Sequence, residues 1–158
     1  MSVKTNAMRV LDQRQVAYEV HEYSPDIHSA VEAAQAMGQP VERVYKTLVV
    51  MREALRAKPL LVMVPGDREL DLRALARSTG DKKLRMATQK EAESLTGLLV
   101  GGIGALALLN RGFEIWIDGA AMRHERICVN AGQRGVNLEL RVDDLVRTTN
   151  ARWINPDG

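Results

Sequence analysis

The amino-acid sequence predicts an α+β fold, in which helices surround a mixed β-sheet. Segments with strand character come both in succession and separated by helical segments, unlike the regular strand–helix alternation of a doubly wound sheet. Residues 60–64 are apolar at every position, which predicts a central strand that is buried on both faces. No internal repeat, low-complexity stretch or linker divides the chain, so we expect one domain over residues 1–158.

The N-terminal part predicts two helices and two strands. A threonine can cap a helix with an apolar stripe over residues 5–12. Alternating hydrophobicity predicts a strand over residues 16–23, and an apolar face predicts a helix over residues 29–37. A helical turn at residues 41–44 leads into residues 44–51, where valine, tyrosine and threonine favour a strand.

The central part is divided by glycine, proline and charged residues. The charged residues 52–58 predict a hairpin connection into the buried strand. An aspartate then caps a helix expected over residues 72–78, and Gly80 follows it as a stop signal. A capping box at residues 88–91 opens a further helix that ends at Gly97.

The C-terminal part begins with a glycine-rich turn at residues 101–104. Short apolar segments after this turn predict three strands, and two successive aspartates open a last helix, before a final edge strand. The expected ranges are 114–118, 126–129 and 137–140 for the three strands, 143–148 for the helix and 151–154 for the edge strand.

Composition narrows the possible functions. Aromatic residues make up only 4% of the chain, which argues against base-stacking platforms for single-stranded nucleic acid. The net charge of +2 permits an anionic partner without implying one. Cys128 is the only cysteine, so no internal disulfide can form and a reducing cytoplasm is expected. The apolar runs are too short to span a membrane, and no signal peptide opens the chain.

Lys46 stands at the start of a strand face. Alternation along residues 44–51 places Lys46 on the same face as Leu48 and Val50, opposite Thr47. A lysine in this position is either a surface residue that extends its ammonium into solvent or a cation held in a cleft. The alternation of side chains along the strand does not distinguish these two options, and the usual exposure of lysine favours the surface residue.

Two glycine-rich turns are candidate ligand contacts. Residues 102–107 have the glycine spacing of a dinucleotide-binding turn, but Gly112 ends any following helix too early for that motif. Consecutive glycines can still aim backbone N–H groups at a ligand, as an oxyanion hole requires. Residues 130–135 form the second such turn. Each turn is either a plain connection or one wall of a pocket.

Metal binding and cysteine catalysis receive little support. His21, His28 and His124 have no metal-ligand spacing and no Cys/His pair suits zinc, so we expect no metal and no cofactor. Cys128 lies in the middle of a predicted strand, which favours a buried structural cysteine over a nucleophile.

Lys82, Lys83 and Arg85 place three cations within four positions after a helix. Lysine and arginine can form charge-assisted hydrogen bonds with phosphates, so this segment is a tentative contact for nucleic-acid backbone. A solvated charged loop is the alternative.

Six stretches, taken in order and spacing, resemble the YbaK/EbsC family of aminoacyl-tRNA deacylases, which are relatives of the editing domain of bacterial prolyl-tRNA synthetases. The resemblance covers nearly the whole chain. The stretches are residues 4–9, 44–49, 65–72, 80–83, 96–103 and 132–135.

The resemblance implies a compact α+β fold with a mixed, partly barrel-like sheet around a small pocket. It implies a trans-editing deacylase that removes a mischarged amino acid from tRNA, with cysteine on proline tRNA as the best-known substrate. In the cysteine-specific branch, the thiol of the substrate itself is thought to attack its ester. The implied partners are aminoacyl-tRNA and prolyl-tRNA synthetase, with no metal or membrane.

The resemblance also assigns roles to residues. It places the family lysine at Lys46 and the oxyanion-binding glycine loop at Gly101 and Gly102. A pocket tyrosine matches Tyr23. The further substrate-binding positions that it implies are Thr47, Ile103, Gly132 and Asn137.

This chain departs from the family pattern at two places. Gly104 and Ala105 stand where the family loop usually has serine and proline, which predicts a looser loop. Asn137 replaces a common aspartate. These departures favour an alternative function, a catalytically inert module that binds tRNA, a synthetase or a small anionic ligand. A hydrolase that uses Cys128 is a third hypothesis.

Overall fold

The computed structural model describes residues 4–53 and 57–154. Its strands are β1 (Glu19–Glu22), β2 (Val44–Arg52), β3 (Leu60–Pro65), β4 (Leu84–Met86), β5 (Glu114–Asp118), β6 (Arg126–Asn130), β7 (Val136–Arg141) and β8 (Arg152–Ile154). Its α-helices are α1 (Asn6–Gln13), α2 (Ala30–Met37), α3 (Leu72–Thr79), α4 (Gln89–Thr96) and α5 (Val142–Thr149), and its 3₁₀ helices are η1 (Val41–Arg43), η2 (Ala105–Arg111) and η3 (Gly119–Arg123).

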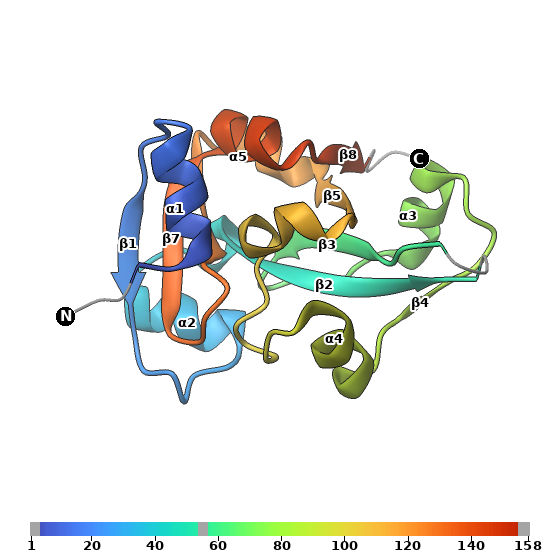
Figure 1. Cartoon of the computed structure of the whole chain (residues 1–158), viewed down its shortest axis with the longest axis horizontal. Coiled ribbons are helices and arrows are strands. Elements are labelled where there is room, and N and C mark those ends of the chain that lie inside the picture. Colours follow the sequence, from blue (N-terminus) through green and yellow to red (C-terminus); the bar gives the residue numbers. More distant parts are fainter. Residues whose placement is uncertain (1–3, 54–56, 155–158) are drawn as a thin grey trace.

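The strands form one mixed sheet, which confirms the predicted fold class (Figure 1). Its strand order is β1-β7-β6-β2-β3-β5-β8, and β4 pairs with β2 outside this path. Strand β2 is parallel to β6 and antiparallel to β3 and β4, while β5 runs parallel to both β3 and β8. In Figure 1, α2 and α4 lie below β2 and α5 lies above it.

Strand β2 has one complete edge and one divided edge. On one edge β3 pairs with Tyr45 through Val50. On the other edge β6 pairs only with Val44 and Tyr45, and β4 pairs only with Val50 through Arg52. Among the described strands, none pairs with the middle of β2 on this second edge. The sheet is therefore open there.

The core occupies both faces of the sheet. Strand β3 is buried at every residue, as the continuous apolar run predicts. Leu61 and Met63 face one core with α1, α5 and η2, whereas Leu60, Val62 and Val64 face a second core with α3. This two-sided burial makes β3 the centre of the sheet.

Local capping explains the helix boundaries. The side chains of Thr5, Ser29 and Asp71 accept hydrogen bonds from the first turns of α1, α2 and α3. Thr88 and Glu91 form the expected capping box at the start of α4. These four predicted helix starts are confirmed.

Three segments differ from the prediction. Strand β1 begins only at Glu19, because the N–H of Val16 bonds the Leu11 carbonyl (2.9 Å) in the turn that ends α1. The segment Leu84–Met86, expected as a charged loop, forms strand β4 against β2. Helix η3 was not predicted. Of the expected hairpin connection, residues 54–56 lie outside the described residues.

In the described part of the chain, no helix has both the length and the hydropathy that a membrane span needs.

Leu61→Ala tests the central position of β3. Leu61 is 0% exposed, so its truncation should lower the free energy of unfolding by about 2–5 kcal/mol. Leu99→Ala removes the same atoms from a side chain that is 55% exposed, and should change stability by less than about 0.5 kcal/mol. Urea denaturation measures both. Equal losses would contradict the assigned burial.

Candidate functional site

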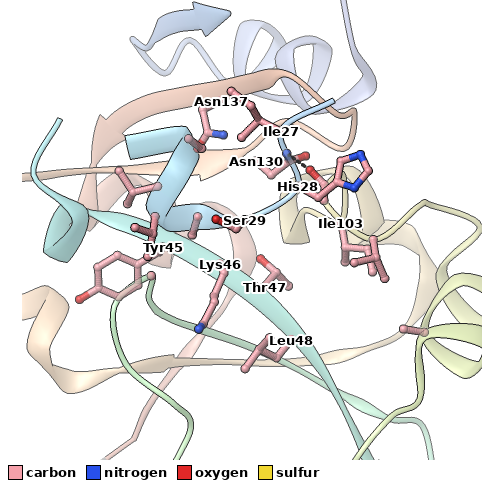
Figure 2. Close-up of a pocket in the computed structure, with 18 of the residues that line it drawn as sticks. Ile27, His28, Ser29, Tyr45, Lys46, Thr47, Leu48, Ile103, Asn130 and Asn137 are labelled. Atoms are coloured by element: carbon pink, nitrogen blue, oxygen red, sulfur yellow. Dashed lines mark hydrogen bonds between the residues drawn. The ribbon is translucent and has the colours of Figure 1, made fainter. Parts of the chain in front are cut away.

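A cavity of about 450 Å³ lies at the divided edge of β2. Residues from the middle of β2 form its floor, and its walls come from segments far apart in sequence (Figure 2). Its lining residues include Tyr23, His28, Lys46, Thr47, Leu48, Met86, Gly101, Ile103, Asn130 and Asn137. The gap between β6 and β4 thus becomes a pocket.

Lys46 is a half-buried residue of this pocket. Alternation holds in part, because Tyr45, Thr47 and Val49 are buried whereas Lys46 and Leu48 are partly exposed. No aspartate or glutamate is among the described lining residues, and Lys46 forms no ion pair with the described residues. Figure 2 shows the side chain extending away from Ile103. The pocket therefore has a positive charge with no balancing carboxylate in its walls.

The glycine loop beside the pocket is held by side chains. Asn130 donates from Nδ2 to the carbonyl oxygen of Gly101 (3.0 Å), and Arg134 donates from Nε to that of Val100 (2.8 Å). The N–H of Val100 donates to the Glu93 carboxylate (2.8 Å). These bonds hold the loop without the proline of the family pattern, and the looser loop stays a prediction.

Gly102 does not take the place expected for it. Its N–H donates to the carbonyl oxygen of Leu99 (2.7 Å), and a Cβ there would lie 2.8 Å from the Arg134 nitrogen. Gly102 is absent from the described lining of the pocket, whereas Gly101 and Ile103 are present. Neither Gly101 nor Ile103 donates its N–H to an acceptor within the described ranges. Gly101 and Ile103 are therefore candidate backbone donors in the pocket lining.

Gly101 also has two local reasons to be glycine. Its φ of +91° lies in the left-handed region. A Cβ at this position would lie 3.2 Å from both Cα and Cβ of His28. The loop and the segment that carries His28 consequently approach each other closely across the pocket.

Tyr23, Asn130 and Asn137 form a polar wall. The Nδ2 group of Asn137 donates to the Tyr23 hydroxyl (2.7 Å). Burial raises the pKa of Tyr23, an effect that its hydrogen bonds with Asn137 and Asn130 oppose, so the phenol stays protonated at neutral pH. The Asn137 Oδ1 atom is buried and has no partner among the described residues.

The remaining predicted substrate contacts are divided between pocket and scaffold. Thr47 and Ile103 line the pocket, and the buried Thr47 hydroxyl has no partner in the described part of the chain. Gly132 does not line it. A Cβ on Gly132 would lie 2.5 Å from that of Ala107, and its φ is +89°, so this glycine serves the packing of a turn.

The basic segment lines a second cavity of about 470 Å³ on the other side of β4. Lys82, Lys83 and Arg85 contribute to it, while Met86 of the same strand lines the first pocket. Arg85 is bound to both carboxylate oxygens of Glu91 at 2.8 Å. The two lysines are thus the better candidates for contact with an anionic partner.

Asn130 is a functional residue that sequence reasoning did not single out. Its Oδ1 accepts from the N–H groups of Gly132 (2.6 Å) and Gln133 (3.0 Å), which forms an Asx turn. An asparagine two residues before a glycine could have signalled this turn. Its bond to the Gly101 carbonyl joins the end of β6 to a loop 29 residues away in the chain, so it could not have been read locally.

Cys128 does not line the pocket, and its side chain is buried. Burial raises the pKa of its thiol to about 12, and the nearby Glu139 carboxylate adds to this rise. A thiol with such a pKa is a poor nucleophile at neutral pH. The cysteine-hydrolase hypothesis therefore loses its support.

Comparison with known proteins identifies related sequences and structures. The sequence profile described as "Aminoacyl-tRNA editing domain" matches residues 24–148. An Enterococcus faecalis protein with the provisional name Cys-tRNA(Pro)/Cys-tRNA(Cys) deacylase EbsC is 34% identical over 152 residues, covering 95% of this chain and 91% of its own. A proline–tRNA ligase from Thermosipho melanesiensis is 30% identical over 88 residues, which cover 56% of this chain and 15% of the ligase.

Solved structures show the same fold. A crystal structure described provisionally as a trans-editing enzyme for prolyl-tRNA synthetase matches with a TM-score of 0.78 and 28% identity, covering 96% of both chains. The crystal structure of hypothetical protein APE2540 matches with a TM-score of 0.84 and 24% identity over 94% of this chain and 96% of that one. The second likeness concerns the fold alone.

Alkylation of Cys128 tests its burial and its raised pKa. With a pKa of about 12, the thiolate fraction near pH 8 is about a thousandfold below that of an ordinary cysteine. Iodoacetamide should therefore label the native chain at least that much more slowly than the urea-unfolded chain. The native rate should rise about tenfold per pH unit up to pH 10. Similar rates for the two states would contradict the assigned environment.

Proposed function

The chain belongs to the aminoacyl-tRNA editing-domain family, and from this premise we propose that it hydrolyses mischarged aminoacyl-tRNA in trans, in the cytoplasm. The observation that carries the proposal is that Lys46, Gly101 and Ile103 line one pocket, and that Gly101 and Ile103 donate their N–H groups to no acceptor in the described residues. The provisional name of the Enterococcus relative supports cysteine on proline tRNA as the first substrate to test.

Backbone donors would stabilise the developing charge. Ester cleavage places negative charge on the carbonyl oxygen, and the N–H groups of Gly101 and Ile103 are candidate donors to it from the pocket lining. One such donor typically contributes about 3–4 kcal/mol to transition-state stabilisation. Asn130 keeps the loop in place through the Gly101 carbonyl. It acts as a positioning residue.

Lys46 would bind the negatively charged end of the tRNA. Its direction away from Ile103 supports a contact with the 3′-terminal nucleotide more than one with the ester carbonyl. Because the described pocket walls contain no acidic residue, no carboxylate there offsets the attraction between Lys46 and an anionic ligand. Binding energy from this remote group would orient the ester against the loop.

The attacking group would come from the substrate or from water. Cys128 lies outside the pocket with a raised pKa, so it is not proposed as the nucleophile. For a cysteinyl ester, the substrate sulfur can bond to the carbonyl carbon while the ester C–O bond breaks and the ribose oxygen takes up the proton that the thiol loses. Water then opens the resulting cysteine thiolactone to give free cysteine. The protein then contributes position and charge stabilisation.

Asn137 and Thr47 would receive the amino-acid moiety. The buried Oδ1 of Asn137 and hydroxyl of Thr47 have no partners in the described residues. A buried unpaired polar atom costs about 1–3 kcal/mol, so a ligand that supplies the missing bonds is favoured. The amino group of the substrate can donate to Asn137 Oδ1 without the carboxylate of the family pattern.

A second candidate function is a catalytically inert binding module for tRNA or a synthetase. Asn137 in place of the common aspartate is the observation that favours it. A panel of Cys-tRNA(Pro), Ala-tRNA(Pro) and correctly charged Pro-tRNA(Pro) discriminates the two functions. Tight binding of the panel without hydrolysis of any member would support the module and contradict the deacylase.

Lys46→Met removes the charge of Lys46 while keeping a similar aliphatic stem. We expect kcat/KM for the best substrate of the panel to fall about 100–1,000-fold, as for other transition-state or orienting charges. Lys58→Met is the matched control, because Lys58 is an exposed lysine outside both cavities. Thermal melts establish that both variants are folded. A wild-type rate for Lys46→Met would exclude the proposed role.

The double substitution Lys82→Gln and Lys83→Gln tests whether this segment contacts the tRNA backbone. If each lysine contacts one phosphate, the slope of log binding constant against log salt should decrease by about 1–2 in magnitude. Arg141→Gln with Arg147→Gln removes two exposed charges outside both cavities and should leave the slope nearly unchanged. Fluorescence anisotropy with labelled tRNA measures the slopes. Identical slopes for wild type and the Lys82/Lys83 variant would remove this segment from the binding surface.

A further inference from the structure

Three side chains with metal-binding atoms meet beside the polar wall of the pocket. They are His21 on β1, Cys128 on β6 and Glu139 on β7, and their ligand atoms all lie within 4.8 Å of one another. The His21 Nε2 atom lies 2.9 Å from Glu139 Oε1. This cluster is separate from the residues that line the pocket.

The register of the sheet places the cluster beside the polar wall of the pocket. Cys128 is directly opposite Glu139, and Asn130 is directly opposite Asn137, in the antiparallel pair of β6 and β7. Because side chains two residues apart on a strand share a face, Cys128 lies on the same face as Asn130, and Glu139 on the same face as Asn137. On β1, His21 is directly opposite Asn137, so its side chain reaches Glu139 diagonally across the strand pair.

This arrangement explains why the sequence gives no sign of the cluster. His21 and Cys128 are separated by more than a hundred positions, so no ligand spacing exists in the chain. Strand β7 brings them together, because it pairs with β1 on one side and with β6 on the other. The sequence therefore lacks a Cys/His pair only among residues that are close together in the chain, whereas the fold brings His21 and Cys128 together.

The cluster is largely buried but can be reached by an ion from solvent. Cys128 is 1% exposed, while the side chains of His21 and Glu139 are 22% and 12% exposed. Strand β1 is an edge strand, so solvent can reach the site from that side. An ion could enter there and bind a fixed, largely dehydrated set of donors.

We propose that His21, Cys128 and Glu139 bind one divalent transition-metal ion of the zinc class, with water as the fourth ligand. Imidazole nitrogen, thiolate sulfur and carboxylate oxygen are the donors that zinc takes, and hard cations such as magnesium avoid the thiolate. Zinc–ligand bonds of about 2.0–2.3 Å set donor separations of about 3.3–3.8 Å. The donors lie within 4.8 Å of one another, so the widest separation must close by at most about 1 Å, whereas His21 Nε2 and Glu139 Oε1, 2.9 Å apart, must move apart by about 0.4 Å. The ion would replace the thiol proton and the bond between His21 and Glu139.

The ion would act on the pocket by position and would not take part in the reaction. Binding would tie β1 to β6 and β7 beside the polar wall of Tyr23, Asn130 and Asn137. Tyr23 directly follows β1 in the chain and lines the pocket, and its hydroxyl accepts a hydrogen bond from Asn137. Metal occupancy would therefore stiffen the polar wall that receives the substrate.

Cobalt(II) titration of the chelator-treated full-length chain tests the site without tRNA. We expect one cobalt per chain, intense visible bands typical of tetrahedral cobalt and a thiolate-to-cobalt charge-transfer band in the near ultraviolet. Cys128→Ser should abolish the charge-transfer band, and Glu139→Gln should weaken binding at least tenfold. His124→Ala, which removes a histidine outside the cluster, should match the wild type.

Zinc-dependent stability gives a second measurement. Excess zinc should raise the thermal midpoint of the wild type and of His124→Ala, and leave that of Cys128→Ser and of His21→Ala unchanged. The proposal is overturned if cobalt gives no charge-transfer band, or if zinc stabilises wild type and His21→Ala equally. These outcomes concern the metal site alone, since neither measurement uses the deacylase reaction.

Discussion

The divided edge of β2 is the constraint on which the pocket depends. Strand β6 pairs with its beginning and β4 with its end, so the middle of the strand has a paired neighbour only on the β3 side. A continuous neighbour would have covered Lys46 and Thr47 and closed the pocket. Instead the glycine loop and the segment around His28 face this opening. Lys46 is thus a pocket residue because of the strand order, which alternation along its own strand does not reveal.

The fold was predictable where local physics decides it. Caps at Thr5, Ser29, Asp71 and Thr88 satisfy the first N–H groups of their helices, and each is readable from a few residues. The apolar run of β3 is equally local. Strand β4 was not predictable, because Leu84–Met86 is a strand only through its three pairs with β2. The missed segments are those whose structure depends on partners distant in sequence.

The glycines of the site also have different roles that the sequence alone does not distinguish. Resemblance and composition assign Gly101, Gly102 and Gly132 to the pocket, but the three have different physical roles. Gly101 lines the pocket, Gly102 donates its N–H to Leu99, and Gly132 makes room for Ala107. Gly104 makes room too, since a Cβ there would lie 2.3 Å from the Asn130 carbonyl oxygen. The serine of the family pattern would not fit, so this departure follows from close packing against the Asn130 turn.

The amide at position 137 has a comparable explanation in its surroundings. Glu139 lies two residues away on the same face, held by His21, and its carboxylate is largely buried. An aspartate at position 137 would add a second buried carboxylate nearby, and like charges in a low dielectric raise each other's cost of ionisation. Asparagine avoids that repulsion, donates to Tyr23 and leaves Oδ1 without a partner in the described residues. Because the described pocket walls contain no acidic residue, the positive charge of Lys46 suits the anionic end of the proposed tRNA substrate better than its ammonium group.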